Sequence, residues 1–261
     1  MDFWLWLQQN LTVFLLMFAR ISAMLVTAPV LGSRNVPVAA KAGLSILLSY
    51  ILLPLYGGQV QPLAEGFLPY ALLIGKEAIL GLILGYFCLL VFQAVQAAGH
   101  LLDMQIGFGI VNVFDPQFGG QVPLLGNFKY MLAIIVFLIS NGHHVVLTAL
   151  ADSFNLLPIG NWTLPLTITD FFAGAVVNVF IIALKVSLPV MVAIFLTDLA
   201  LGILARMIPQ MNLFVVGIPG KLIIGVLMLA LALPVYVLLL EVAFDDLYND
   251  LYHLLNLIRA G

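Results

Sequence analysis

The sequence predicts an all-α, multi-pass membrane protein with about six long apolar helices. Its 261 residues are 64% hydrophobic and 8% charged, and the mean hydropathy is +1.19. A soluble domain carries about 25% charged residues, so these few charges could not cover a water-facing surface. Several runs without charge reach the roughly 20 residues that a helix needs to cross about 30 Å of hydrocarbon. None has the alternating pattern of an outer-membrane barrel strand.

Six charge-poor runs give the expected spans in order. They cover 3–19, 42–64, 78–102, 130–151, 171–197 (with Lys185 inside it) and 222–240. Proline and glycine mark the connections, because neither residue continues a helix easily. They are Pro29, Gly32 and Pro37 after the first run, Pro54, Gly57, Gly58 and Pro62 ending the second, Pro158, Gly160 and Pro165 before the fifth, and Pro209, Gly217, Pro219 and Gly220 before the sixth.

Two of the expected helices are too long for a simple span. Nothing stops a helix from Pro69 to about Ile106, which is roughly 57 Å at 1.5 Å per residue. Asp170 to about Arg206 gives roughly 54 Å on the same rise. Tilt absorbs only part of such an excess. One explanation is a kink that shortens them, at Gly99 in the helix 69–106 or at Pro189 in the helix 170–206. The other is that both helices run past the bilayer and pack against partner subunits.

Composition and motifs argue against several classes of function. Nine Lys and Arg against twelve Asp and Glu give a net charge of −3, so nucleic-acid binding is not expected. The single Cys88 excludes an intrachain disulfide. Adjacent His143 and His144 point about 100° apart on a helix, and a polar helix terminus at 140–144 is favoured over a metal site. Without a nucleophile, metal or phosphate-binding motif, we expect no catalytic residue and no cofactor.

Charged residues inside apolar runs are more informative. Arg20, Lys185 and Asp198 lie in such runs, where each charge costs about 2.5–3.5 kcal/mol at a helix centre. Lys185 and Asp198 are roughly 20 Å apart along one helix and cannot pair locally. The alternatives are buried interhelical salt bridges, and contact with partner subunits or a hydrated pore. With Arg206 and Lys221, these residues form the predicted set of subunit contacts or buried charges.

Two spacings indicate packing between helices. Gly81 and Gly85 form a GxxxG pair, which lets two helices approach closely. His100 and Asp103 are three residues apart and could face each other on one helix. For that pair, a satisfied polar contact in a helix bundle is favoured over a proton relay.

The stretch 107–123 lies between two apolar helices but cannot itself be a stable helix. Its four glycines and two prolines break helices, while its apolar side chains are unlike those of a solvated loop. Irregular backbone at membrane depth is tolerated only where protein or a water-filled cavity surrounds it. We favour a re-entrant or pore-inserted segment over a surface loop. The residues concerned are Gly107, Phe108, Gly109, Ile110, Val113, Phe114, Asp115, Pro116, Phe118, Gly119 and Gly120.

Several separated motifs extend over essentially the whole chain. They are FARISAM at 18–24, APVLGSR at 28–34, Pro37, KAG at 41–43, MQIGFG at 104–109, DP at 115–116, GGQVP at 119–123 and NGHH at 141–144. Together they resemble the FliR family of flagellar biosynthetic proteins, more than its homologues in virulence type III secretion.

The last third carries a second resemblance. LKVSLP at 184–189, PQMN at 209–212, GIPGK at 217–221 and Pro234 are similar to FliQ, a small two-helix subunit. The resemblance implies a FliP-like part over 1–170, which includes the loop at about 107–123. It also implies a FliQ-like hairpin with a C-terminal tail over 171–261. Helices that build a conical complex largely clear of the hydrocarbon would then account for the two excessive lengths.

What the resemblance implies is a non-enzymatic subunit of the flagellar type III export gate in the bacterial inner membrane. FliP and FliQ would surround a channel with it, FlhB would wrap the cytoplasmic side, and unfolded flagellar proteins would pass through. In this family a FliR loop plugs the closed channel, and 107–123 matches it. A small-solute transporter is the alternative, suggested by the intramembrane charges and the Gly/Pro-broken segment. The two halves of the chain, however, do not resemble each other.

Overall fold

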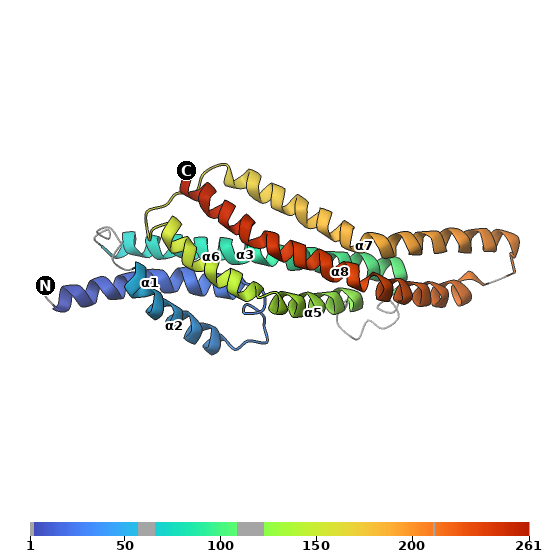
Figure 1. The fold of residues 1–261 in the computed structure, drawn as a ribbon, viewed down its shortest axis with the longest axis horizontal. Coiled ribbons are helices and arrows are strands. Elements are labelled where there is room, and N and C mark those ends of the chain that lie inside the picture. Colours follow the sequence, from blue (N-terminus) through green and yellow to red (C-terminus); the bar gives the residue numbers. More distant parts are fainter. Residues whose placement is uncertain (1–2, 57–65, 109–122, 211, 261) are drawn as a thin grey trace. The chain divides into compact units, whose positions relative to one another are not determined.

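The computed structural model describes residues 3–56, 66–108, 123–210 and 212–260. Within these ranges the chain is helical and has no strand, which confirms the all-α fold class. The helices are α1 (Phe3–Thr27), α2 (Val38–Tyr56), α3 (Phe67–Ile106), α5 (Leu124–Ile139), α6 (Gly142–Leu156), α7 (Ile168–Met207) and α8 (Leu213–Ala260) (Figure 1).

Five of these helices, α1, α2, α3, α7 and α8, are long and apolar enough to cross a membrane alone. Helices α5 and α6 meet at 67° and qualify only as a bent pair, which gives up to six spans in the described chain. The prediction of one helix over 130–151 is therefore wrong. Asn141 has a φ of 58°, in the left-handed region that asparagine tolerates better than most residues, and it breaks the helix. The predicted polar helix terminus at 140–144 is confirmed.

The two helices that were expected to be too long for a simple membrane span are α3 and α7, and both are long. Both α3 and α7 have 40 residues, with ends within three residues of the predicted positions. Helix α8 has 48 residues and extends far beyond the expected span 222–240. The prediction that Gly217, Pro219 and Gly220 belong to the connection before the sixth span is wrong, because α8 already begins at Leu213. Membrane helices tolerate proline and glycine, since lipid offers the backbone no alternative hydrogen-bond partner that would favour unwinding.

The described residues form two compact units, each built from separated parts of the sequence. The first unit takes its residues from 1–90, 141–174 and 245–261, and the second from 91–140 and 175–244. These units are defined by compactness, whereas the predicted FliP-like part (1–170) and FliQ-like part (171–261) are defined by resemblance to other proteins. The units therefore do not test the predicted parts, which stay a prediction.

In the first unit, α1 and α3 pack in direct contact through glycine. A Cβ atom at Gly81 would collide with the backbone oxygen of Arg20, and one at Gly85 with that of Met24. Leu16, Met17, Ile21, Leu80 and Leu84 are fully buried around this contact. The GxxxG pair therefore acts as a packing motif, as predicted.

In the second unit, α3, α5, α7 and α8 surround an apolar core. One cluster consists of Leu102, Ile106, Leu125, Val190 and Ile194. A second contact joins Phe92, Phe137 and Phe244, whose ring centroids are 5.2–5.4 Å apart. Such aromatic pairs stabilise a core by about 0.5–1.5 kcal/mol beyond the area that they bury.

We predict that Gly81→Ala destabilises the first unit. The added methyl group has no room against the backbone of α1, and overpacking of this kind typically lowers the free energy of unfolding by about 1–3 kcal/mol. Thermal unfolding of the detergent-solubilised protein, followed by circular dichroism, measures the effect. Gly43→Ala in α2 is the matched control, because a Cβ there meets nothing within 4 Å. Equal unfolding temperatures for the two variants would contradict the close approach.

Candidate functional site

Arg20 of α1 is a fully buried charge in the first unit. Its side chain and that of Glu77 on α3 are both 0% exposed, and Arg20 Nε donates to Glu77 Oε2 at 2.6 Å. Arg20 Nη1 donates to the carbonyl oxygen of Ser153 at 2.9 Å, and Nη2 to that of Leu157 at 3.0 Å. The Phe154 ring lies 4.4 Å from the guanidinium carbon. Every guanidinium nitrogen thus has an acceptor, so α1, α3 and α6 are joined at one point.

Glu77 also holds the connector between α6 and α7. Its Oε1 accepts hydrogen bonds from the backbone N–H of Gly160 at 2.9 Å and from Trp162 Nε1 at 3.1 Å. The neighbouring Lys76 donates to the Gly160 carbonyl oxygen at 3.0 Å, and its ammonium lies 4.9 Å from the Trp162 ring centroid. Glu77 is not among the residues predicted from the sequence, because it stands at the edge of an apolar run beside a lysine.

The other charges predicted as contacts lie in the second unit. Lys185 and Arg206 on α7 are exposed, and neither forms an ion pair with any residue that the structure describes. Asp198 on α7 pairs with Lys221 on α8 at 2.8 Å, with side chains 45% and 22% exposed. Lipid is a poor environment for exposed charges, so these positions need water or protein around them.

Asp103 on α3 has a role that its sequence position did not indicate. Its two carboxylate oxygens accept from the backbone N–H groups of Leu125 and Gly126 at 3.0 and 3.2 Å. It therefore caps the start of α5, where Pro123 provides no side-chain cap. His100 is exposed and does not pair with Asp103, so that expectation is wrong. The free N–H groups at a helix start compete successfully for the carboxylate.

Lys129 of α5 is buried without a carboxylate partner among the described residues. It is 4% exposed, and its ammonium donates to the Val186 carbonyl oxygen at 3.4 Å and lies 4.9 Å from the Tyr236 ring centroid. The Tyr236 hydroxyl donates to the Lys129 carbonyl oxygen at 2.7 Å. This group links α5, α7 and α8. In the sequence, the only sign of this buried group is the position of Lys129 next to the start of an apolar run.

The ends of the segment 107–123 are described and its middle is not. Helix α3 stops at Ile106, and Gly107 follows with a φ of 101°, a conformation that favours glycine. Phe108 packs against the apolar cluster of the second unit. The remaining residues predicted as a plug lie outside the described residues; they are Gly109, Ile110, Val113, Phe114, Asp115, Pro116, Phe118, Gly119 and Gly120.

The described part of the chain brings together no set of three or more His, Cys, Asp or Glu side chains that could hold a metal ion. Its polar groups are used instead to join apolar helices. With five to six candidate spans, these features define the class: a multi-pass integral membrane protein whose buried charges organise a helix bundle.

Comparison with known proteins specifies the family. The family model described as "Bacterial export proteins, family 1" matches residues 11–247, and the chain belongs to this family. It is 39% identical to flagellar biosynthetic protein FliR of Bacillus subtilis (strain 168), over 95% of this chain and 96% of the relative. It is 32% identical to FliR of Escherichia coli (strain K12), over 91% and 90% of the two chains. Identity to Yop proteins translocation protein T of Yersinia pestis is 28%, over 86% and 87%. The resemblance predicted from the motifs is confirmed.

We predict that Glu77→Ala strongly destabilises the protein. It leaves the Arg20 charge buried without a counter-ion, which costs about 3–5 kcal/mol of unfolding free energy. The double variant Arg20→Met/Glu77→Leu removes both charges and should recover much of that loss. Denaturant unfolding in detergent measures both, with Glu241→Ala, an exposed glutamate on α8, as the control. A double variant as unstable as Glu77→Ala would show that the pair matters for something other than charge compensation.

Proposed function

We propose that this chain forms, together with FliP and FliQ subunits, the channel of the flagellar type III protein export gate. The gate lies in the bacterial inner membrane at the flagellar basal body, with FlhB on its cytoplasmic side. Unfolded flagellar proteins cross the membrane through it. The observation that supports this proposal most strongly is the 39% identity to a FliR protein over 95% of the chain.

The surface of the second unit supports a role among partner subunits. Helices of 40 and 48 residues exceed the roughly 20 that a bilayer covers. Along α7, large apolar side chains stay exposed well beyond that length, including Phe180, Phe195 and Ile203, each about 60% exposed. Lipid can cover only part of this surface. Neighbouring apolar helices of other subunits are the natural cover for the rest.

The helical hairpin supports the proposed division of the chain at residue 170. Helices α7 and α8 are joined by a short connection at 208–212, and the Asp198–Lys221 ion pair links them near this turn. A two-helix hairpin is what a FliQ-like part over 171–261 requires. The role is non-enzymatic, because a channel subunit contributes surfaces and a path rather than reacting groups. The description of the family, "Bacterial export proteins, family 1", supports this.

A small-solute transporter is the second candidate, and one observation favours it. Lys129 is buried without a described carboxylate partner, and such residues in membrane proteins often mark an ion or substrate pathway. Isolation in mild detergent separates the two functions. Recovery in a large complex with FliP-like and FliQ-like proteins supports the export gate, whereas a monomer that binds a small solute supports the transporter.

We predict that Lys185→Glu reduces recovery of the intact complex. Lys185 is exposed on α7, and reversing a charge at a subunit contact replaces attraction with repulsion that costs several kcal/mol, so yield should fall at least about tenfold. Complex yield after tagged purification from membranes is the measurement. Lys185→Arg keeps the charge and is the matched control. An unchanged yield for Lys185→Glu would mean that this residue faces water instead of a partner.

We predict that deleting residues 110–118 opens a leak for ions. Apolar bulk in a narrow lumen resists water and ions by dewetting, so its removal should raise membrane conductance provided that the complex assembles. Ion flux across membranes of the deletion strain is the readout. Deleting 57–65, a stretch of equal length between α2 and α3, is the matched control. An assembled deletion complex that remains tight would identify 107–123 as an anchoring loop.

A further inference from the structure

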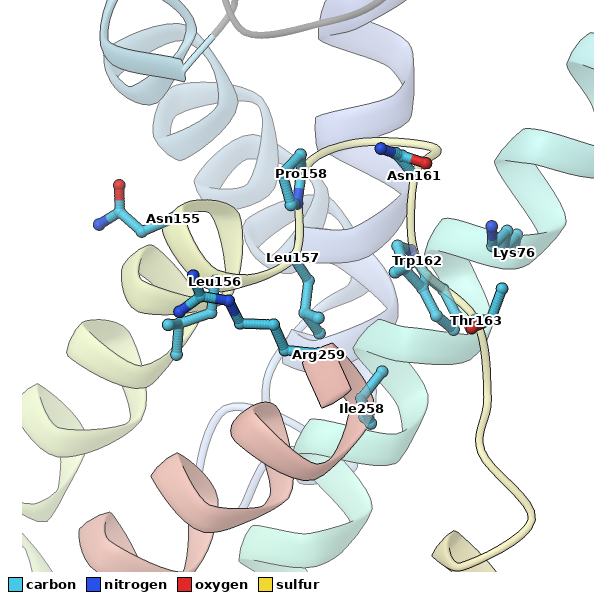
Figure 2. A pocket seen from close by; sticks show the side chains of 10 residues that line it. All are labelled: Lys76, Asn155, Leu156, Leu157, Pro158, Asn161, Trp162, Thr163, Ile258 and Arg259. Carbon is cyan, nitrogen blue, oxygen red and sulfur yellow. The ribbon is translucent and has the colours of Figure 1, made fainter. Parts of the chain in front are cut away.

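A cavity of about 410 Å³ lies in the first unit (Figure 2). Its walls come from the end of α6, the connector 157–167, α3 and the end of α8. Lys76 lies on one side and Arg259 on another, and Asn155, Asn161 and Trp162 contribute further lining. The volume falls within the range of about 300–1,000 Å³ that is usual for small-molecule sites.

The charges that line this cavity are all positive. Lys76 and Arg259 contribute two cations, and no carboxylate belongs to the lining residues, all of which are described. The nearby Glu77 is neutralised by Arg20 and already accepts from Gly160 and Trp162. An ammonium has three N–H donors, and Lys76 uses one on the Gly160 carbonyl oxygen. Arg259 is exposed and has no hydrogen-bond partner among the described residues. The site is therefore suited to an anion.

A second, apolar cavity of about 310 Å³ shares Lys76 and Trp162 with the first. Leu72 and Ile79 of α3 line it, and they are 68% and 48% exposed. Gly75 lies between them in the lining, and a Cβ atom at this residue would meet nothing within 4 Å, so the groove is open there. A free inorganic anion has no use for such a groove, whereas a hydrocarbon chain does.

We propose that the two cavities together bind one anionic phospholipid. Its phosphate headgroup occupies the cavity between Lys76 and Arg259, and one acyl chain follows the groove along α3. The cavity lies where α6 and α8 end and α7 has not yet begun. Tryptophan, here Trp162, is typical of the headgroup level of a membrane, and basic pockets between membrane helices bind anionic headgroups. This inference requires only a membrane protein and does not depend on the export function.

Native mass spectrometry of the full chain in maltoside detergent tests the headgroup. Phosphatidylglycerol and phosphatidylcholine with identical acyl chains are the probes, and we expect phosphatidylglycerol to be retained about tenfold more strongly. Arg259→Gln should lower phosphatidylglycerol binding about tenfold, because a hydrogen bond to a charged group is lost. Arg34→Gln, an exposed arginine outside the cavity, should leave it unchanged. Equal retention of the two lipids, or no effect of Arg259→Gln, overturns the proposal.

The groove distinguishes a lipid from a free phosphate. Gly75→Leu fills the groove and should lower phosphatidylglycerol binding at least about fivefold, since part of the acyl-chain burial is lost. Gly43→Leu, at an equally open helical glycine in α2, is the matched control. Competition by inorganic phosphate at millimolar concentration is measured alongside, with the circular dichroism spectrum confirming that each variant is folded. Displacement by phosphate together with full binding by Gly75→Leu would indicate a phosphate site and overturn the lipid assignment.

Discussion

The arrangement of the first unit depends on one ion pair that has no access to water. Arg20 and Glu77 are both fully buried, and removing charges from water costs several kcal/mol for each ion. The attraction between the two ions compensates this cost only if they are close together and their remaining polar atoms are hydrogen-bonded. Both conditions hold here. Such a pair adds little to net stability, and we infer that its main contribution is to specificity. It fixes the register of α1 against α3 at the point where glycines bring the two backbones together.

The same pair also determines what lies around it. Because Glu77 Oε1 binds the Gly160 N–H and the Trp162 indole, the connector between α6 and α7 is held against α3. That contact places Trp162 beside Lys76 and so forms one wall of the cationic cavity. The second unit uses polar groups differently. Asp103 and Lys129 bind backbone N–H and carbonyl groups rather than opposite charges, and each thereby joins two helices.

The sequence predicted most of the helices but few of the contacts between them. Uninterrupted apolar runs predicted α3 and α7 with ends correct to within three residues, because a helix continues until proline, glycine or polar residues stop it. The length of α8 was missed, because Pro219, Pro234 and the acidic residues after 240 resemble stop signals yet lie inside the helix. Glu77, Asp103 and Lys129 were not recognised as buried links, since a residue's own neighbours do not reveal which distant backbone it meets.

The distance along the chain between Arg20 and Glu77 has a consequence for biosynthesis. The two residues are separated by 57 positions, which a ribosome adds in roughly 3–11 s at about 5–20 residues per second. During that interval α1 carries a cation that costs about 2.5–3.5 kcal/mol at the centre of a lone membrane helix. The first helix is therefore less stable in the membrane until the third helix supplies the carboxylate. We expect the N-terminal helices to settle as a cooperative group rather than one helix at a time.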